Sequence, residues 1–117
     1  MGAYTGTMIN VLEPRIKATV FMGGGLAREV RPAETDPFNF VPRMHAPTLM
    51  VNGTNDFQYP LEMSQLPEFR LLNLPADRKH HALFDGGHMP NQIHDVIRVI
   101  LDWYDRFLGP VKSVAQP

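Results

Sequence analysis

The sequence has no cysteine, two serines, no long apolar run and almost no net charge. The absence of cysteine excludes disulfides, iron–sulfur clusters, zinc-thiolate sites and a cysteine nucleophile. A net charge of −1 without a basic run gives no support for binding nucleic acid or an anionic membrane surface. No apolar run approaches the roughly 20 residues that span a bilayer, and the N-terminus lacks a charged head before an apolar stretch. We therefore expect a cytoplasmic protein.

Length and composition are typical of one small globular domain. The chain has 117 residues, of which 44% are hydrophobic and 20% are charged. A chain of this size buries roughly two-thirds of its unfolded surface, which allows one modest core. We expect a single domain over residues 1–111 and a frayed tail over residues 112–117.

Hydrophobic periodicity and turn residues predict helices and strands in alternation. The expected helices are Gly2–Leu12, a short helix that starts near Pro60 and is interrupted by Pro67, and a long helix that is capped by Asn91 and ends at Leu108. The expected strands are Ile16–Met22, Thr48–Val51 (which Asn52-Gly53 would end) and His80–Phe84. This alternation predicts the α/β class, with a parallel three-stranded sheet and flanking helices. The long irregular segment Leu26–Ala46 is of the kind that forms a wall or lid over a site.

Two polar residues follow strand ends, and ligands bind at the carboxyl ends of strands in open parallel sheets. Asp56 lies five residues beyond Val51, and His88 lies four residues beyond Phe84. If the two strands are neighbours, the carboxylate can fix the tautomer of the imidazole and stabilise its cation. Gly86-Gly87 would allow the tight turn that brings the ring back over the strand end. The competing interpretations are an Asx-turn residue at Asp56 and a solvent-exposed loop histidine at His88.

Other candidate sites find less support in the residue pattern. A metal site could draw on His80, His81, His88 and Asp85, but adjacent strand residues point to opposite faces, so His80 and His81 cannot easily bind one ion. Asp85 is also a rival acid for His88, although its place suits a turn former. Gly23–Gly25 permits a sharp turn but lacks the GxGxxG or GK[ST] pattern of a phosphate loop. We expect neither a metal nor a cofactor.

Several segments carry motifs in the order of a known family. They are Asp36–Pro42, Pro47–Gly53 with Asp56 and Tyr59-Pro60, Phe84–His88 (FDGGH) and the helix Asn91–Leu108. In this order they resemble the loop before the acid strand, the acid segment, the histidine segment and the last helix of the α/β-hydrolases. The likeness is closest to the dienelactone-hydrolase-like and prolyl-oligopeptidase-like branch, and it extends from about Tyr4 to Val111.

The resemblance implies that residues 1–111 are the C-terminal part of an α/β-hydrolase fold. The implied activity is that of a serine hydrolase, which cleaves ester or peptide-like bonds by acyl transfer. Asp56 would be the triad acid and His88 the general base. The serine of the family's G-x-S-x-G turn should precede both, whereas Ser64 and Ser113 follow Asp56 and lack the flanking glycines. We therefore expect a C-terminal portion of a longer hydrolase, cut just past the nucleophile and inactive when isolated.

The same resemblance implies an open sheet edge. In the family's sheet the strand at Ile16–Met22 would pair with the nucleophile strand. A bare apolar edge favours self-association or binding of the missing half. In the parent enzyme the substrate would be a small-molecule ester or a peptide. The alternative function is a non-catalytic α/β interaction module that associates through this edge, and such a module has no need for Asp56 and His88 at the strand ends.

Overall fold

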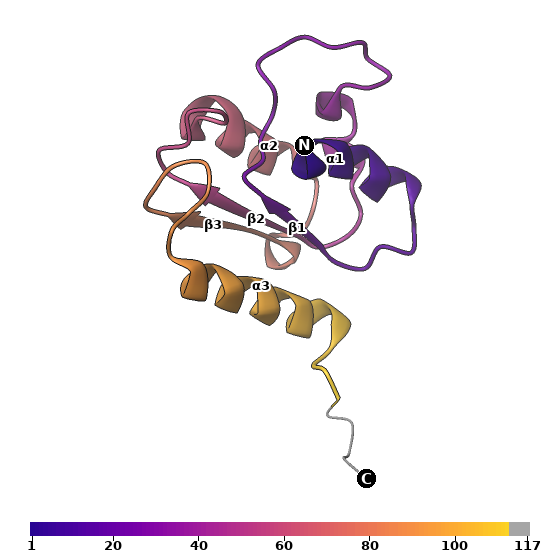
Figure 1. Ribbon diagram of the computed structural model, residues 1–117. Coiled ribbons are helices and arrows are strands. Elements are labelled where there is room, and N and C mark those ends of the chain that lie inside the picture. The colour runs from indigo at the N-terminus through magenta and orange to yellow at the C-terminus, as the bar shows by residue number, and fades with distance from the viewer. Residues whose placement is uncertain (113–117) are drawn as a thin grey trace.

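The computed structural model describes residues 1–112 and shows a parallel sheet between two layers of helices (Figure 1). The strands, in the sheet order β1-β2-β3, are β1 (Thr19–Met22), β2 (Thr48–Gly53) and β3 (Lys79–Phe84). The longer helices are α1 (Gly2–Leu12), α2 (Leu66–Leu71) and α3 (Ile93–Leu108). A π-helical turn spans Leu61–Gln65, and 3₁₀ turns span Pro37–Asn39, Val41–Arg43 and Ala76–Arg78. The predicted α/β class, with a parallel three-stranded sheet and flanking helices, is confirmed; the predicted tail lies, from residue 113 onward, outside the described residues.

Each face of the sheet has its own apolar core, because side chains alternate along the strands. Phe21 and Met50 point to the face that α1 and α2 cover, whereas Leu49 and Val51 point to α3 (Figure 1). The central strand β2 is buried along its whole length, which explains its continuous apolar run. Trp103 of α3 lies in the second core.

The ends of two strands differ from the prediction. β1 begins at Thr19 rather than Ile16, because its partner β2 begins at Thr48 and earlier residues have no strand to pair with. β2 does not stop at Asn52-Gly53, since both residues pair with the last two residues of β3. Pairing with a neighbouring strand overrides the local preference of these two residues for a turn.

Two helix boundaries also differ. Pro67 does not interrupt a helix: it lies in the first turn of α2, where its missing N–H has no helical partner to lose, and the π-helical turn precedes it. Asn91 does not cap α3, which begins at Ile93. The capping position belongs to Gln92, whose side chain donates instead to the carbonyl oxygen of Asp85 at 2.9 Å. Within residues 1–112, no helix is both long enough and apolar enough to cross a membrane.

A carboxyl group is buried where α2 packs on the sheet. Glu68 is only 2% exposed, and it forms no ion pair with another residue in the described part of the chain. Burial disfavours the charged form and raises the pKa of Glu68 to about 8. The folded protein therefore keeps this side chain protonated at pH values at which the unfolded chain has lost the proton.

Because of this difference, we expect the free energy of unfolding to decrease as the pH rises. Between about pH 4.5 and 8 the folded state binds one proton more than the unfolded state at Glu68, so the free energy of unfolding decreases across this window, by on the order of a few kcal/mol. Glu68→Gln should remove this decrease. Urea unfolding from pH 5 to 8 measures it. The exposed Glu62→Gln is the matched control and should keep the wild-type profile; a Glu68→Gln profile parallel to the wild type would contradict the prediction.

Candidate active site

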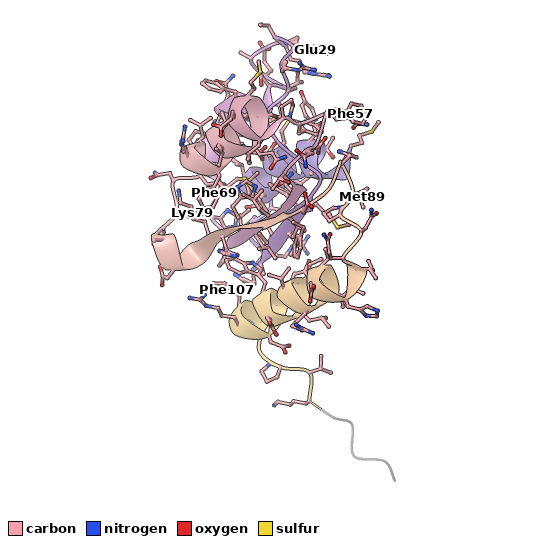
Figure 2. All side chains as sticks on the ribbon, turned by 90° about the vertical axis from the view of Figure 1, so that its left-hand side faces the viewer. Glu29, Phe57, Phe69, Lys79, Met89 and Phe107 are labelled. Atoms are coloured by element: carbon pink, nitrogen blue, oxygen red, sulfur yellow. The ribbon has the colours of Figure 1, made fainter. Side chains whose placement is uncertain are left out.

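Asp56 and His88 meet at the carboxyl ends of β2 and β3. Nδ1 of His88 lies 2.8 Å from Oδ2 of Asp56, whose side chain is fully buried, while the His88 side chain is 30% exposed. Figure 2 shows their chain neighbours Phe57 and Met89 at the same end of the sheet, away from Lys79 at the start of β3. The structure thus brings together the two residues that were predicted to form a pair.

The second carboxylate oxygen of Asp56 holds its own loop. Oδ1 accepts hydrogen bonds from the backbone N–H groups of Gln58 at 2.8 Å and Tyr59 at 3.0 Å. This is the Asx-turn geometry that was the competing interpretation of Asp56. The two interpretations hold together, because one oxygen closes the turn and the other accepts from the imidazole. The turn thereby aims Oδ2 at the ring.

The loops that carry the pair are joined by their backbones. The amides of Thr54 and Asn55 donate to the carbonyl oxygens of Phe84 and Gly86, at 2.9 and 2.8 Å. Gly53, at the end of β2, leaves room for this contact: a Cβ atom there would lie 1.8 Å from the Gly87 carbonyl oxygen. The position of His88 over the sheet therefore depends on the missing side chain at residue 53.

The rest of the His88 ring faces a glycine and a tyrosine. A Cβ atom on Gly23, whose φ is +63°, would lie 3.4 Å from Nε2, so this segment passes directly beside the free ring nitrogen. Nε2 forms no hydrogen bond with any residue from 1 to 112. The Tyr59 ring stacks on the imidazole, with centroids 6.1 Å apart. Burial, followed by the nearby Glu68 and Asp56, raises the pKa of Tyr59, which keeps its phenol neutral.

A series of side-chain hydrogen bonds holds the segment Gly23–Gly25 in place. The Asn52 side chain donates to the carbonyl oxygen of Gly24 at 2.8 Å, and its own oxygen lies 3.1 Å from Nε2 of His81. Burial, and secondarily His80, lowers the pKa of His81, so this ring is neutral near pH 7. These hydrogen bonds join the segment that follows β1 to β2 and β3.

The glycine segment also contacts the start of α1. A Cβ atom on Gly24 would lie 2.7 Å from Cβ of Ala3, in the first turn of α1. Gly23 therefore adjoins His88, and the next residue, Gly24, adjoins the first turn of α1. Two consecutive glycines thus connect the surroundings of the free ring nitrogen to the start of this helix.

The rival sites are not assembled. His81 stacks on Phe69 of α2, while His80 lines a hollow with Trp103 of α3, so the two rings lie on opposite faces as expected. Asp85 accepts from Asn55 at 3.4 Å, and the acid that meets His88 is Asp56. Among residues 1–112, no three histidine, aspartate or glutamate side chains are grouped closely enough to bind a metal.

A cleft of about 500 Å³ opens beside the pair. Its lining residues are Ala27, Arg28, Glu29, Arg31, Gln58 and Tyr59. The first four belong to the long segment that was expected to form a wall, and Figure 2 shows Glu29 at its exposed margin. Tyr59 separates this cleft from His88, on which it stacks. The Tyr59 ring therefore contributes both to the lining of the cleft and to the surroundings of the imidazole.

Comparison with known proteins shows the fold and nothing finer. No family model matches the chain, and no curated protein is similar to it in sequence. The crystal structure of TT1662 from Thermus thermophilus is similar, with a TM-score of 0.65 over 86% of this chain and 17% sequence identity. The match covers 50% of that protein, so this chain spans about half its length. At this level of identity the likeness supports the α/β fold alone.

Sequence reasoning missed several residues that hold the site. Asn52 was expected only to end a strand, and Gln65, which donates to the carbonyl oxygens of Gly53 and Tyr59, was not considered. No local signal identifies Gln65, because its partners depend on how the helical turn packs on β2. A polar side chain inside the apolar run of β2 was a usable signal for Asn52, since buried polar groups are nearly always hydrogen-bonded.

The contact at Gly53 generates a prediction. Gly53→Ala would push a Cβ atom into the backbone of Gly87, so it should lower the free energy of unfolding by about 2 kcal/mol or more. It should also move the amide NMR signals of residues 85–90. Gly87→Ala is the matched control, because nothing lies within 4 Å of a Cβ there. Equal destabilisation by the two substitutions, measured by urea unfolding, would show that the close approach does not exist.

Proposed function

We propose that the chain supplies the acid and the general base of a serine hydrolase that cleaves ester or peptide-like bonds by acyl transfer. The observation that carries the proposal is the 2.8 Å contact between Nδ1 of His88 and the buried Oδ2 of Asp56, with Nε2 left without a partner among residues 1–112. A structural histidine in a loop has no need of a buried carboxylate aimed at one nitrogen while the other stays free. The resemblance of the two motifs to α/β-hydrolases supports the same assignment.

The chemistry follows from the state of the imidazole. Neutral His88 donates its Nδ1 proton to Asp56, so Nε2 has a lone pair available for a proton. As a hydroxyl oxygen attacks the acyl carbon, Nε2 takes the hydroxyl proton, and Asp56 stabilises the imidazolium that results. The imidazolium then returns the proton to the leaving oxygen or nitrogen. In the second half-reaction water attacks the acyl group, its proton passes through Nε2, and the hydroxyl is regenerated.

Neither serine of the sequence is assigned as the source of this hydroxyl. Ser64 is fully buried, and its hydroxyl donates to the carbonyl oxygen of Leu26. Ser113 lies outside the described residues. Because Gly23 adjoins Nε2 of His88 and Gly24 adjoins Ala3 of α1, a nucleophile placed just ahead of α1 suits the free ring nitrogen.

The alternative function is an interaction module that associates through the sheet edge. The exposed edge of β1 favours this function, since β1 pairs with β2 alone. Such a module does not account for the buried carboxylate and its imidazole. The hydrolase role is therefore the better supported of the two, and the edge is compatible with either.

An extended variant tests the proposal. A designed apolar strand ending in Gly-X-Ser is joined directly before Met1, so that the added serine precedes α1. We expect this variant to react with a fluorophosphonate ester and to hydrolyse p-nitrophenyl acetate, because Nε2 of His88 would then accept the serine proton. The unextended chain should show neither reaction above background.

Three further variants decide the result. Replacing the added serine by alanine should abolish labelling, and His88→Ala in the extended chain should lower the hydrolysis rate by roughly 10³-fold or more. His94→Ala, on the exposed side of α3, is the matched control and should leave the rate unchanged. An extended chain with a folded amide NMR spectrum that labels no faster than its alanine counterpart would contradict the proposal.

A further inference from the structure

The outer edge of β1 is a row of unpaired backbone groups. On the side of β2, the amides of Thr19 and Gly23 donate to the carbonyl oxygens of Pro47 at 2.8 Å and Val51 at 2.9 Å. Because successive amides of a strand point to opposite sides, those of Val20 and Met22 point away from β2, where no described strand lies. The strand reads TVFM, without the charges or prolines that commonly protect an edge.

A row of exposed apolar side chains runs along α3. Its spacing of four residues, then seven, keeps it on one flank of the helix. Its members are 47–58% exposed: Ile93, Ile97, Leu101 and Leu108. The hydrophobic stripe of α3 is therefore wider than the sheet covers, since the buried half is formed by Val96 and Trp103.

This row faces the same side of the molecule as the open edge. The opposite flank of α3, with Asp102 and Arg106, borders a hollow of about 300 Å³ together with Lys79 and His80 of β3. Because β3 and β1 are the two outer strands of the sheet, the exposed row lies toward β1. Met22, which is 41% exposed, shares the α3 side of the sheet with Val20. Strand edge and helix row thus form one continuous surface.

The charged residues beside this row are placed so that those of one copy can pair with those of a second copy. Arg98 lies three residues before Leu101 and Asp105 lies four residues after it. In two antiparallel copies of α3 that are centred between Leu101 and Asp102, Arg98 of each copy comes opposite Asp105 of the other. Within residues 1–112, Arg98 forms one ion pair, with the exposed Asp95 at 3.4 Å in its own helix, and such a contact is weak. Asp105 has no ion-pair partner within residues 1–112.

We propose that this surface is a twofold interface with a second copy of the chain. A twofold axis perpendicular to the sheet pairs β1 with β1 in antiparallel fashion, centred on Phe21, so that Val20 and Met22 exchange hydrogen bonds across the axis. The result is a continuous six-stranded sheet, twice the three strands of one copy. The same axis keeps both α3 helices on one face, antiparallel and side by side. Contacts are the same on both copies, as a closed dimer requires. The inference does not rest on the proposed function.

Substitution of an outward amide tests the strand contact. The unmodified chain should show a concentration-dependent mass that approaches twice 13.2 kDa in sedimentation equilibrium. Met22→Pro removes an N–H that β2 does not use, so the monomer should stay folded while the dissociation constant rises at least about tenfold. Met22→Val is the matched control, because it keeps the N–H, and it should change the dissociation constant less than about threefold.

A charge exchange tests the helix contact and its direction. Arg98→Asp and Asp105→Arg should each weaken the dimer, because each places like charges opposite one another. The double variant should restore most of the loss, since the pairs are then reversed but complementary. Circular dichroism of each variant separates loss of dimer from loss of fold.

Two kinds of result would overturn the proposal of a dimer through this surface. A monomer at every concentration up to the solubility limit would overturn the proposal. A dimer whose dissociation constant does not change with Met22→Pro would place the contact elsewhere and would also overturn the proposal. The same holds if the double charge variant does not recover the dissociation constant. These experiments use the unextended chain, whereas the hydrolase test uses the extended one, so failure of one leaves the other standing.

Discussion

The parallel pairing of β2 with β3 is the constraint on which the site depends. In parallel strands both carboxyl ends reach the same edge of the sheet, so the loops that follow them leave side by side. Two backbone hydrogen bonds from the β2 loop to the β3 loop then hold them together, and this contact is possible because Gly53 has no side chain. Without that close approach, the imidazole and the carboxylate would lie on separate loops with no fixed distance between them.

The surroundings of Asp56 show how the fold fixes a carboxylate beside the imidazole. Its carboxylate is withdrawn from water, and three hydrogen bonds satisfy it: two from its own turn and one from His88. A carboxylate so fixed needs no reorganisation when charge develops on the ring. The free nitrogen of His88, by contrast, faces a segment of small residues beside the first turn of α1. One side of the imidazole is fully engaged and the other is open, which is the asymmetry that a general base requires.

Local patterns predicted the order of the elements and the meeting of Asp56 with His88, because both follow from strand ends and chain direction. They failed at Asn52-Gly53, Pro67 and Asn91, where neighbours in space decide the outcome. Asn52-Gly53 has the local preference of a turn, but in the structure both residues pair with β3, and the Asn52 side chain hydrogen-bonds to Gly24 and His81.

The sequence predicts the long helix that ends at Leu108, but it does not predict how much of the apolar stripe of this helix packs on the sheet. Only half of it packs on this sheet, and the other half lies exposed beside the open edge of β1. A sequence pattern records which side chains are apolar, whereas the width of the sheet decides how many of them are covered. The unprotected edge and the uncovered half-stripe have the same origin, a sheet of three strands under a helix suited to a wider one.

The central claim is that Asp56 holds His88 in one tautomer and leaves the other nitrogen free. A two-bond ¹H–¹⁵N NMR spectrum of the ring, recorded where the imidazole is neutral and with exposed His94 as internal reference, tests it most directly. We expect the His88 proton on Nδ1 and an unprotonated signal from Nε2. A proton on Nε2, or two tautomers in rapid exchange as at His94, would contradict the account.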